Sequence, residues 1–142
     1  MMTKKELMLH YVIVIKGGDN MQMLLIDVKN NKIKPVDVNG LDDYYKYIGC
    51  RCIDIVRRNI GGKYFEIIID DEGWLVNHPI PSAIDKYGEV MLVGNLLIAG
   101  GDVVDGEFTG ITDSEIIHIL QNGYFFVQDV YEEWHNMLTV EY

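Results

Sequence analysis

The chain contains few of the residues on which several classes of protein depend. Only two of its 142 residues are cysteines. Cys50 and Cys52 stand two positions apart in a predicted strand, so both side chains point to one face, a poor geometry for a disulfide. We expect reduced thiols in a cytoplasmic protein, and no metal site, because no second cysteine pair follows. No apolar run reaches the ~18–20 residues that a membrane span needs, so no membrane association is expected.

The motifs of common enzymes are missing as well. The two serines, Ser82 and Ser114, do not lie in a G-x-S-x-G motif, which argues against a nucleophilic hydrolase. The glycines form no phosphate-binding motif, and the four histidines form no H-E-x-x-H. We therefore expect no catalytic residue, no cofactor and no metal. A small hydrolase or metal enzyme that uses Asp102, Asp105 or His78 is the third-ranked alternative.

Basic residues are scarce in one part of the chain. Residues 1–63 carry 11 basic and 7 acidic side chains, whereas residues 64–142 carry Lys86 and 15 acidic side chains, which gives a net charge of −10. A nucleic-acid-binding protein needs a basic face for the phosphates, so direct nucleic-acid binding is not expected. An acidic surface could instead imitate DNA and block a host defence nuclease.

What is present is a succession of short apolar segments separated by turns. This pattern predicts an α+β fold of a single domain, residues 1–142, around one mixed or mainly antiparallel sheet with two or three short helices. Asn39 is predicted to cap the first helix, and Thr112 and Glu115 form a capping box for the second. Val130, Trp134 and Leu138 suggest a last amphipathic helix. The expected strands span 7–16, 22–28, 33–38, 50–57, 64–70, 90–98 and 124–127, and the first two helices span 41–48 and 113–121.

Four segments resemble one known family. They are an opening hairpin (Met23 to Val38), a short helix followed by a strand (Leu41 to Ile53), a strand with an acidic turn (Phe65 to Leu75), and a Gly-Asn strand leading to a Thr-x-x-Glu helix start (Leu92 to Glu115). Their order resembles DUF3846, a bacterial and phage family of unknown function. The resemblance implies a core over about 23–121, with 1–20 as an N-terminal strand extension and 124–142 as a C-terminal extension. Its members resemble cargo of phages and mobile elements.

The candidate ligand-binding residues fall into two groups. Arg51, Arg57 and Arg58 have side chains suited to bidentate contact with phosphate or carboxylate, although they could instead pair with the acidic C-terminal half. Asn77 and His78 lie in an irregular loop, where functional residues concentrate, and Asn95 belongs to the Gly-Asn segment.

These observations favour a non-enzymatic binding protein of a phage or mobile element. We expect it to sequester a small anionic ligand or a host protein and to form a homodimer or higher homo-oligomer. The acidic inhibitor of a host nuclease is the alternative.

Overall fold

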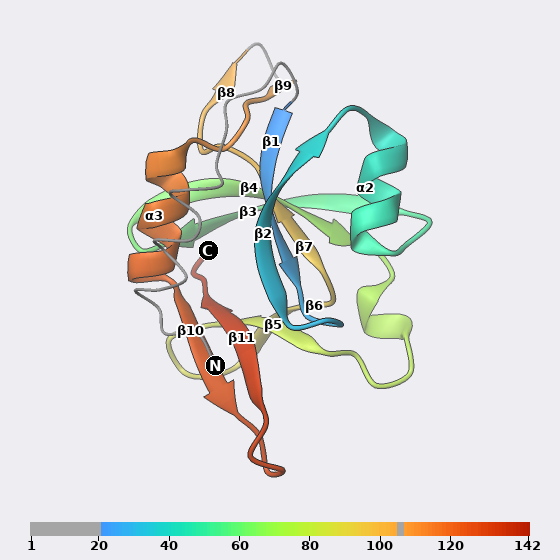
Figure 1. Ribbon diagram of the computed structural model, residues 1–142, viewed down its shortest axis with the longest axis vertical. Helices are drawn as coiled ribbons and strands as arrows, with labels where there is room; N and C mark the ends of the chain where they lie inside the picture. The colour runs from blue at the N-terminus through green and yellow to red at the C-terminus, as the bar shows by residue number, and fades with distance from the viewer. Residues whose placement is uncertain (1–20, 105–106) are drawn as a thin grey trace.

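Figure 1 shows the computed structural model of the chain, which describes residues 21–104 and 107–142. The strand expected over 7–16 lies outside these residues, as does the side chain of Asp105. Within the described part, neither helix is long and apolar enough to cross a membrane. The elements are β1 (Met21–Asp27), β2 (Lys32–Val38), α2 (Leu41–Ile48), β3 (Ile53–Ile60), β4 (Lys63–Asp70), the 3-10 helix η1 (Gly73–Leu75), β5 (Pro81–Ile84), β6 (Val90–Val93), β7 (Leu96–Ile98), β8 (Val103–Val104), β9 (Glu107–Phe108), α3 (Asp113–Asn122), β10 (Tyr124–Gln128) and β11 (Trp134–Thr139).

The larger sheet has five antiparallel strands in the order β2-β1-β7-β4-β3. Its central strands are apolar on both faces, because each face is covered by other elements. Pro35 cannot donate a backbone hydrogen bond, which agrees with the position of β2 at the edge of the sheet. The smaller sheet has the order β10-β11-β5-β6, and its β11 and β5 run parallel.

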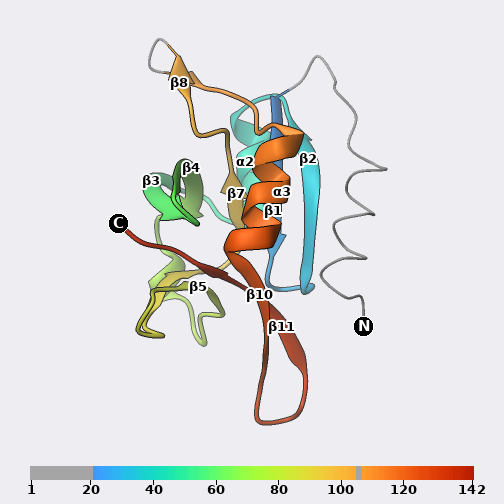
Figure 2. The same cartoon turned by 90° about the vertical axis from the view of Figure 1, so that its left-hand side faces the viewer.

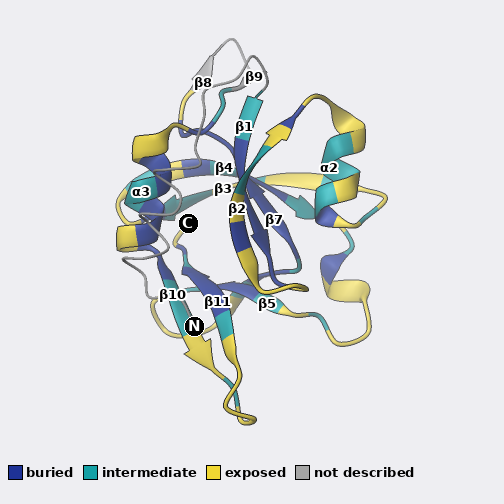
Figure 3. Cartoon of the chain, viewed as in Figure 1, coloured by how far each residue is buried: buried dark blue, intermediate teal, exposed yellow. Residues whose placement is uncertain are grey.

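The two helices lie on opposite sides of the larger sheet (Figure 1). On one face, α3 and the smaller sheet pack against side chains of β1, β4 and β7, among them Leu24, Phe65 and Ile98. On the other face, α2 covers Leu25 and Leu97. Figure 3 shows buried residues along the central strands and exposed residues at the outer turns. The helix α2 lies closest to β1, β4 and β7, and β3 is the edge strand beyond β4.

The α+β class is confirmed, but the expectation of one sheet is wrong in this detail. The apolar run 90–98 was predicted to form one central strand, yet it is divided between the two sheets as β6 and β7. Gly94 adopts φ +77 between them, a conformation that side-chain-bearing residues rarely adopt. The chain turns at this glycine and moves from one sheet to the other.

The predicted helix around Val130 and Trp134 is also wrong. Trp134–Thr139 is strand β11, which pairs with β10 on one side and with β5 on the other. Asn136, Met137 and Leu138 are buried in succession, so both faces of the strand are covered. This pairing with a distant strand outweighs the helical spacing of a few apolar residues.

The capping box of α3 confirms the sequence prediction for this helix. The Thr112 hydroxyl accepts from the Glu115 N–H, and the Glu115 carboxylate accepts from the Thr112 N–H. The bounds predicted for α2, 41–48, are confirmed, but its predicted N-cap residue is wrong. Gly49 ends the helix in the left-handed conformation, but the N-cap residue is Gly40 rather than Asn39.

Glu115 also joins α3 to the larger sheet. Its Oε2 accepts from the Gly101 N–H at 2.8 Å and lies 3.0 Å from Lys63 Nζ. Burial raises the pKa of this carboxyl, but the hydrogen bonds from Gly101, Thr112 and Lys63 outweigh it, and the net pKa is lowered. The buried carboxylate is therefore held in its charged form.

Candidate functional site

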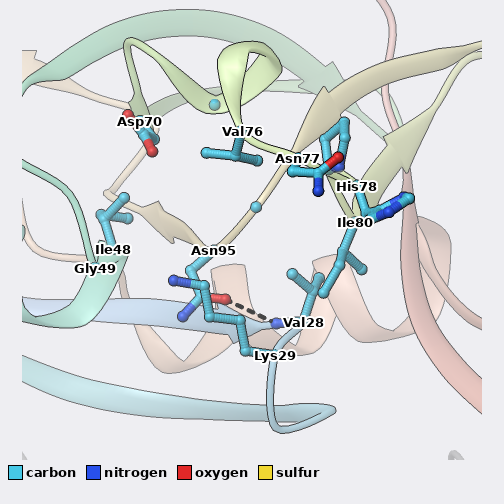
Figure 4. A pocket seen from close by; sticks show the side chains of 13 residues that line it. Val28, Lys29, Ile48, Gly49, Asp70, Val76, Asn77, His78, Ile80 and Asn95 are labelled. Atoms are coloured by element: carbon cyan, nitrogen blue, oxygen red, sulfur yellow. Dashed lines mark hydrogen bonds between the residues drawn. The ribbon is translucent and has the colours of Figure 1, made fainter.

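The described residues line a partly open cavity of about 340 Å³ beside the C-terminus of α2. Five segments form it: the turn after β1, the end of α2, the end of β4 with η1, the loop before β5, and the β6–β7 turn. Small-molecule pockets typically measure ~300–1,000 Å³, so the space suits a small ligand. Figure 4 shows Asp70, Val76 and Asn77 on one side, with Asn95, Val28 and Lys29 opposite.

Asn95 builds one wall of the cavity. Its Oδ1 accepts from the Val28 N–H and its Nδ2 donates to the Tyr47 carbonyl, both at 3.0 Å. The side chain therefore links the ends of β1 and α2 to the β6–β7 turn. Both ends of the amide already have backbone partners, and the residue is only 6% exposed. We therefore interpret Asn95 as a support of the cavity wall and not as a ligand contact.

Lys29 brings a positive charge to the site. A Cβ at Gly49 would lie 2.7 Å from Lys29 Nζ, so the ammonium group lies beside the end of α2. The partial negative charge of a helix C-terminus favours a cation there. Because Gly49 has no side chain, the ammonium group can lie this close to the end of the helix.

The loop from Gly73 to Ile80 supplies the opposite side. Asp70 Oδ1 accepts from the Glu72 N–H at 2.9 Å, which fixes the acidic turn, and the carboxylate also lines the cavity. His78 has a positive φ of 59, unusual for a residue with a side chain. Val76 and Ile80 add exposed apolar surface to the wall.

Three hydrogen-bond donors in this cavity are unengaged. The side chains of Lys29, Asn77 and His78 line it, and none of them makes a hydrogen bond or ion pair with any residue in the described part of the chain. An ammonium group, an amide and an imidazole can each donate a hydrogen bond to an acceptor of a ligand. The arrangement suits a carboxylate or phosphate on a partly apolar ligand.

A second hollow of about 360 Å³ adjoins the cavity and shares Gly49, Asp70 and Val76 with it. Arg51 and Tyr45 line this hollow. Cys50 lines it too, and burial, together with the negative charge of Asp70, raises the pKa of its thiol. A raised pKa disfavours the reactive thiolate, so the hollow is better suited to binding than to nucleophilic chemistry.

The other two arginines lie elsewhere. Arg57 pairs with Glu66 across β3 and β4 at 2.6 Å and lies over the Tyr64 ring, with its guanidinium carbon 5.4 Å from the ring centroid. The Arg58 guanidinium carbon lies 4.6 Å from the centroid of the Tyr142 ring. Neither lines the cavity beside α2.

Of the predicted ligand-binding residues, Asn77, His78 and Asn95 thus line one cavity. Arg51 lines the adjoining hollow, whereas Arg57 and Arg58 lie away from both. Sequence reasoning missed Lys29 and Asp70 as cavity residues. Lys29 directly follows the expected strand 22–28, and Asp70 is the last residue of the expected strand 64–70. These positions indicate a shared cavity only when the order of strands in the sheet is known.

A group of potential metal ligands occurs in the described residues at the turn between β10 and β11. Ligand atoms of Asp129, Glu133 and His135 all lie within 4.8 Å of one another. Asp129 accepts from the Tyr131 and Glu133 N–H groups and from His135. The hydrogen bond from His135 is the largest of the effects that lower the pKa of Asp129. These contacts hold the Asp129 carboxylate and the His135 ring together and close the turn.

No curated protein and no solved structure matches the chain. A family model does match, over residues 21–123, a span that contains every segment of the cavity. The match begins at β1 and ends just after α3, and it leaves β10 and β11 outside. On this evidence the chain belongs to the family described as a domain of unknown function, DUF3846.

Proposed function

We propose that the protein is a non-enzymatic binding protein that holds a small anionic ligand in the cavity beside α2. The observation that carries the proposal is that one cavity is lined by Lys29, Asn77 and His78, three donors without partners among the described residues. A phosphate or carboxylate would accept from them, and hydrogen bonds to a charged group are worth about 1.5–3 kcal/mol each.

Asp70 limits which anions fit. A carboxylate in the same cavity repels a ligand that is negative over its whole surface, whereas a hydroxyl or amino group near Asp70 could donate to it. Val76 and Ile80 offer apolar contact to the remainder of the ligand. A nucleoside 5′-monophosphate has all three features, namely a phosphate, ribose hydroxyls and a flat base, and is the probe we would use first.

Binding rather than catalysis is favoured by the chemistry of the nearby groups. The raised pKa of Cys50 disfavours a thiolate nucleophile. Asp70 accepts from the Glu72 N–H within its own turn. Among the residues lining the cavity in the described part of the chain, no hydroxyl or thiol is paired with His78 as a base.

The acidic-inhibitor alternative receives less support from the described carboxylates. Glu66 and Glu115 pair with cations of β3 and β4. Asp85 and Asp129 accept from backbone N–H groups of their own turns. Carboxylates used in this way are less free to imitate a regular row of phosphates.

Titration calorimetry with a nucleoside 5′-monophosphate tests the proposal, with the nucleoside and inorganic phosphate as comparison ligands. We expect saturable binding of the monophosphate, and about 10–100-fold weaker binding by the Lys29→Ala and Asn77→Ala variants. Lys46→Ala is the matched control, because Lys46 is an exposed lysine of α2 that does not line the cavity. Equal binding by Lys29→Ala and Lys46→Ala would remove the basis for the proposal.

A further inference from the structure

The β10–β11 hairpin ends in an exposed apolar tip. Val130 is 90% exposed and Tyr131 is 82% exposed, and the exposed Trp134 stands at the start of β11. We refer to residues 130–134 as the hairpin tip. Figures 1 and 2 show this hairpin extending away from the two helices and the larger sheet. Adjacent large apolar side chains at a projecting tip are typical of an interaction surface.

The tip is held in place rather than free to collapse. Asn31 Nδ2 donates to the Trp134 carbonyl at 2.6 Å, and its Oδ1 accepts from the Asn136 N–H at 2.8 Å. Asp129 accepts from the Tyr131 and Glu133 N–H groups. A tip ordered in this way loses little conformational entropy when it binds a partner.

The charge of the tip is negative. It contains Glu132 and Glu133, and the sequence has no lysine or arginine after Lys86. Tyrosine and tryptophan are the residues that most often dominate binding energy at interfaces. A complementary surface should therefore offer exposed apolar side chains together with arginine or lysine.

The same chain carries such a surface. The β3–β4 register places Ile55, Arg57 and Tyr64 on one face of the larger sheet, the face to which Ile68 also points. Ile55 and Tyr64 are each 43% exposed, and the Arg57 side chain is 49% exposed. We call these three residues the β3–β4 face. Arg57 is the cation of this face, and the Glu66 side chain beside it is only 13% exposed. The same register places Arg58 and Lys63 on the opposite face, where Lys63 pairs with Glu115.

We propose that the hairpin tip of one copy docks on the β3–β4 face of a second copy. The guanidinium of Arg57 has further donors besides the one directed at Glu66, and these face carboxylates of the incoming tip. Tyr131 and Trp134 bury apolar surface against Ile55 and Tyr64. If each copy gives its tip and receives its partner's, the contact closes as a two-fold dimer. This inference is independent of the cavity beside α2.

Sedimentation velocity on the full chain, over a range of protein concentrations, provides the test. We expect concentration-dependent dimers that weaken as salt is added. The double variant Tyr131→Ser/Trp134→Ser should weaken association by at least about tenfold. Tyr87→Ser is the control, because Tyr87 is an exposed tyrosine on the β5–β6 turn. A wild-type chain that stays monomeric throughout would overturn the proposal.

Reversing the charges identifies the two surfaces. Glu132→Lys/Glu133→Lys reverses the charge of the tip. Arg57→Glu/Glu66→Gln replaces the cation of the face by a carboxylate without placing two carboxylates opposite each other on β3 and β4. Each variant alone should be monomeric, and an equimolar mixture should form mixed dimers. Asp71→Lys/Glu89→Lys makes the same charge change as the tip variant, at exposed positions elsewhere, and should dimerise like the wild type.

Two outcomes of this experiment contradict the proposal: dimers that persist in the tip variant, or a mixture that stays monomeric although both variants show wild-type thermal unfolding. If the face variant does not fold, the serine variants of the exposed tip still decide the matter. The tip variants should leave ligand titration unchanged, so failure of this proposal is distinguishable from failure of the proposed ligand site.

Discussion

Replacement of Asn95 by alanine should destabilise the fold by about 2–4 kcal/mol. The substitution removes the acceptor of the Val28 N–H and the donor to the Tyr47 carbonyl. A buried group left without its partner costs about 1–3 kcal/mol. Val28 is buried, so its N–H bears the full cost, whereas Tyr47 is half-buried and its carbonyl can recover part of the loss from water.

Urea unfolding followed by circular dichroism measures this effect. With a slope of about 2 kcal/mol/M, the midpoint should fall by roughly 1–2 M while the slope stays unchanged. Asn77→Ala is the matched control, because Asn77 lines the same cavity but is exposed and has no side-chain hydrogen bond to any residue the structure describes. It should change stability by less than about 0.5 kcal/mol.

The opposite pattern would refute the assignment of roles. If Asn95→Ala keeps wild-type stability but loses ligand binding, Asn95 is a ligand contact and not a support of the cavity wall. If Asn77→Ala unfolds as easily as Asn95→Ala, the loop before β5 carries more of the stability than its exposure indicates.

Three further substitutions have defined outcomes. Glu115→Gln should lower the free energy of unfolding by about 1–3 kcal/mol at neutral pH. The folded-state pKa of Glu115 is lowered from 4.5. The stability that its carboxylate contributes is therefore complete above the unfolded-state pKa and is lost as pH falls through the folded-state pKa. The urea midpoints of the wild type and of Glu115→Gln should converge between pH 7 and pH 3. Thr112→Ala should cost about 1 kcal/mol through the lost cap of α3, and a loss below about 0.3 kcal/mol would deny the cap that role. Gly123→Ala would place a Cβ 2.2 Å from Ile60 Cγ2; it should cost about 1–3 kcal/mol, and a thermal midpoint equal to that of the wild type would contradict the packing described there.

The elements that the sequence predicts well are those whose signals are local. The α3 helix has its capping box within four residues, and the end of α2 is marked by Gly49, so both helices could be placed from neighbouring residues. The division of residues 90–98 between two sheets depends on pairing with strands far along the chain. The local pattern of that apolar run is the same in either arrangement.

The candidate site shows the same limit. Asn77 and His78 were predicted because polar residues in an irregular loop attract attention by themselves. Lys29 and Asp70 could not be predicted, because their relation to the loop is created by the order of β1, β7 and β4 in the sheet. Arg57 and Arg58 were candidates by residue type, but β3 places them away from the cavity, where Arg57 pairs with Glu66.

The most direct test of the central claim is to map ligand contacts by ¹H–¹⁵N NMR while a nucleoside 5′-monophosphate is titrated into the full chain. We expect saturable shifts at the backbone amides of Lys29, Gly49, Asn77 and His78, with the amides of Arg57 and Arg58 unchanged. Saturable shifts centred on Arg57 and Arg58, or the absence of any saturable shift, would contradict it.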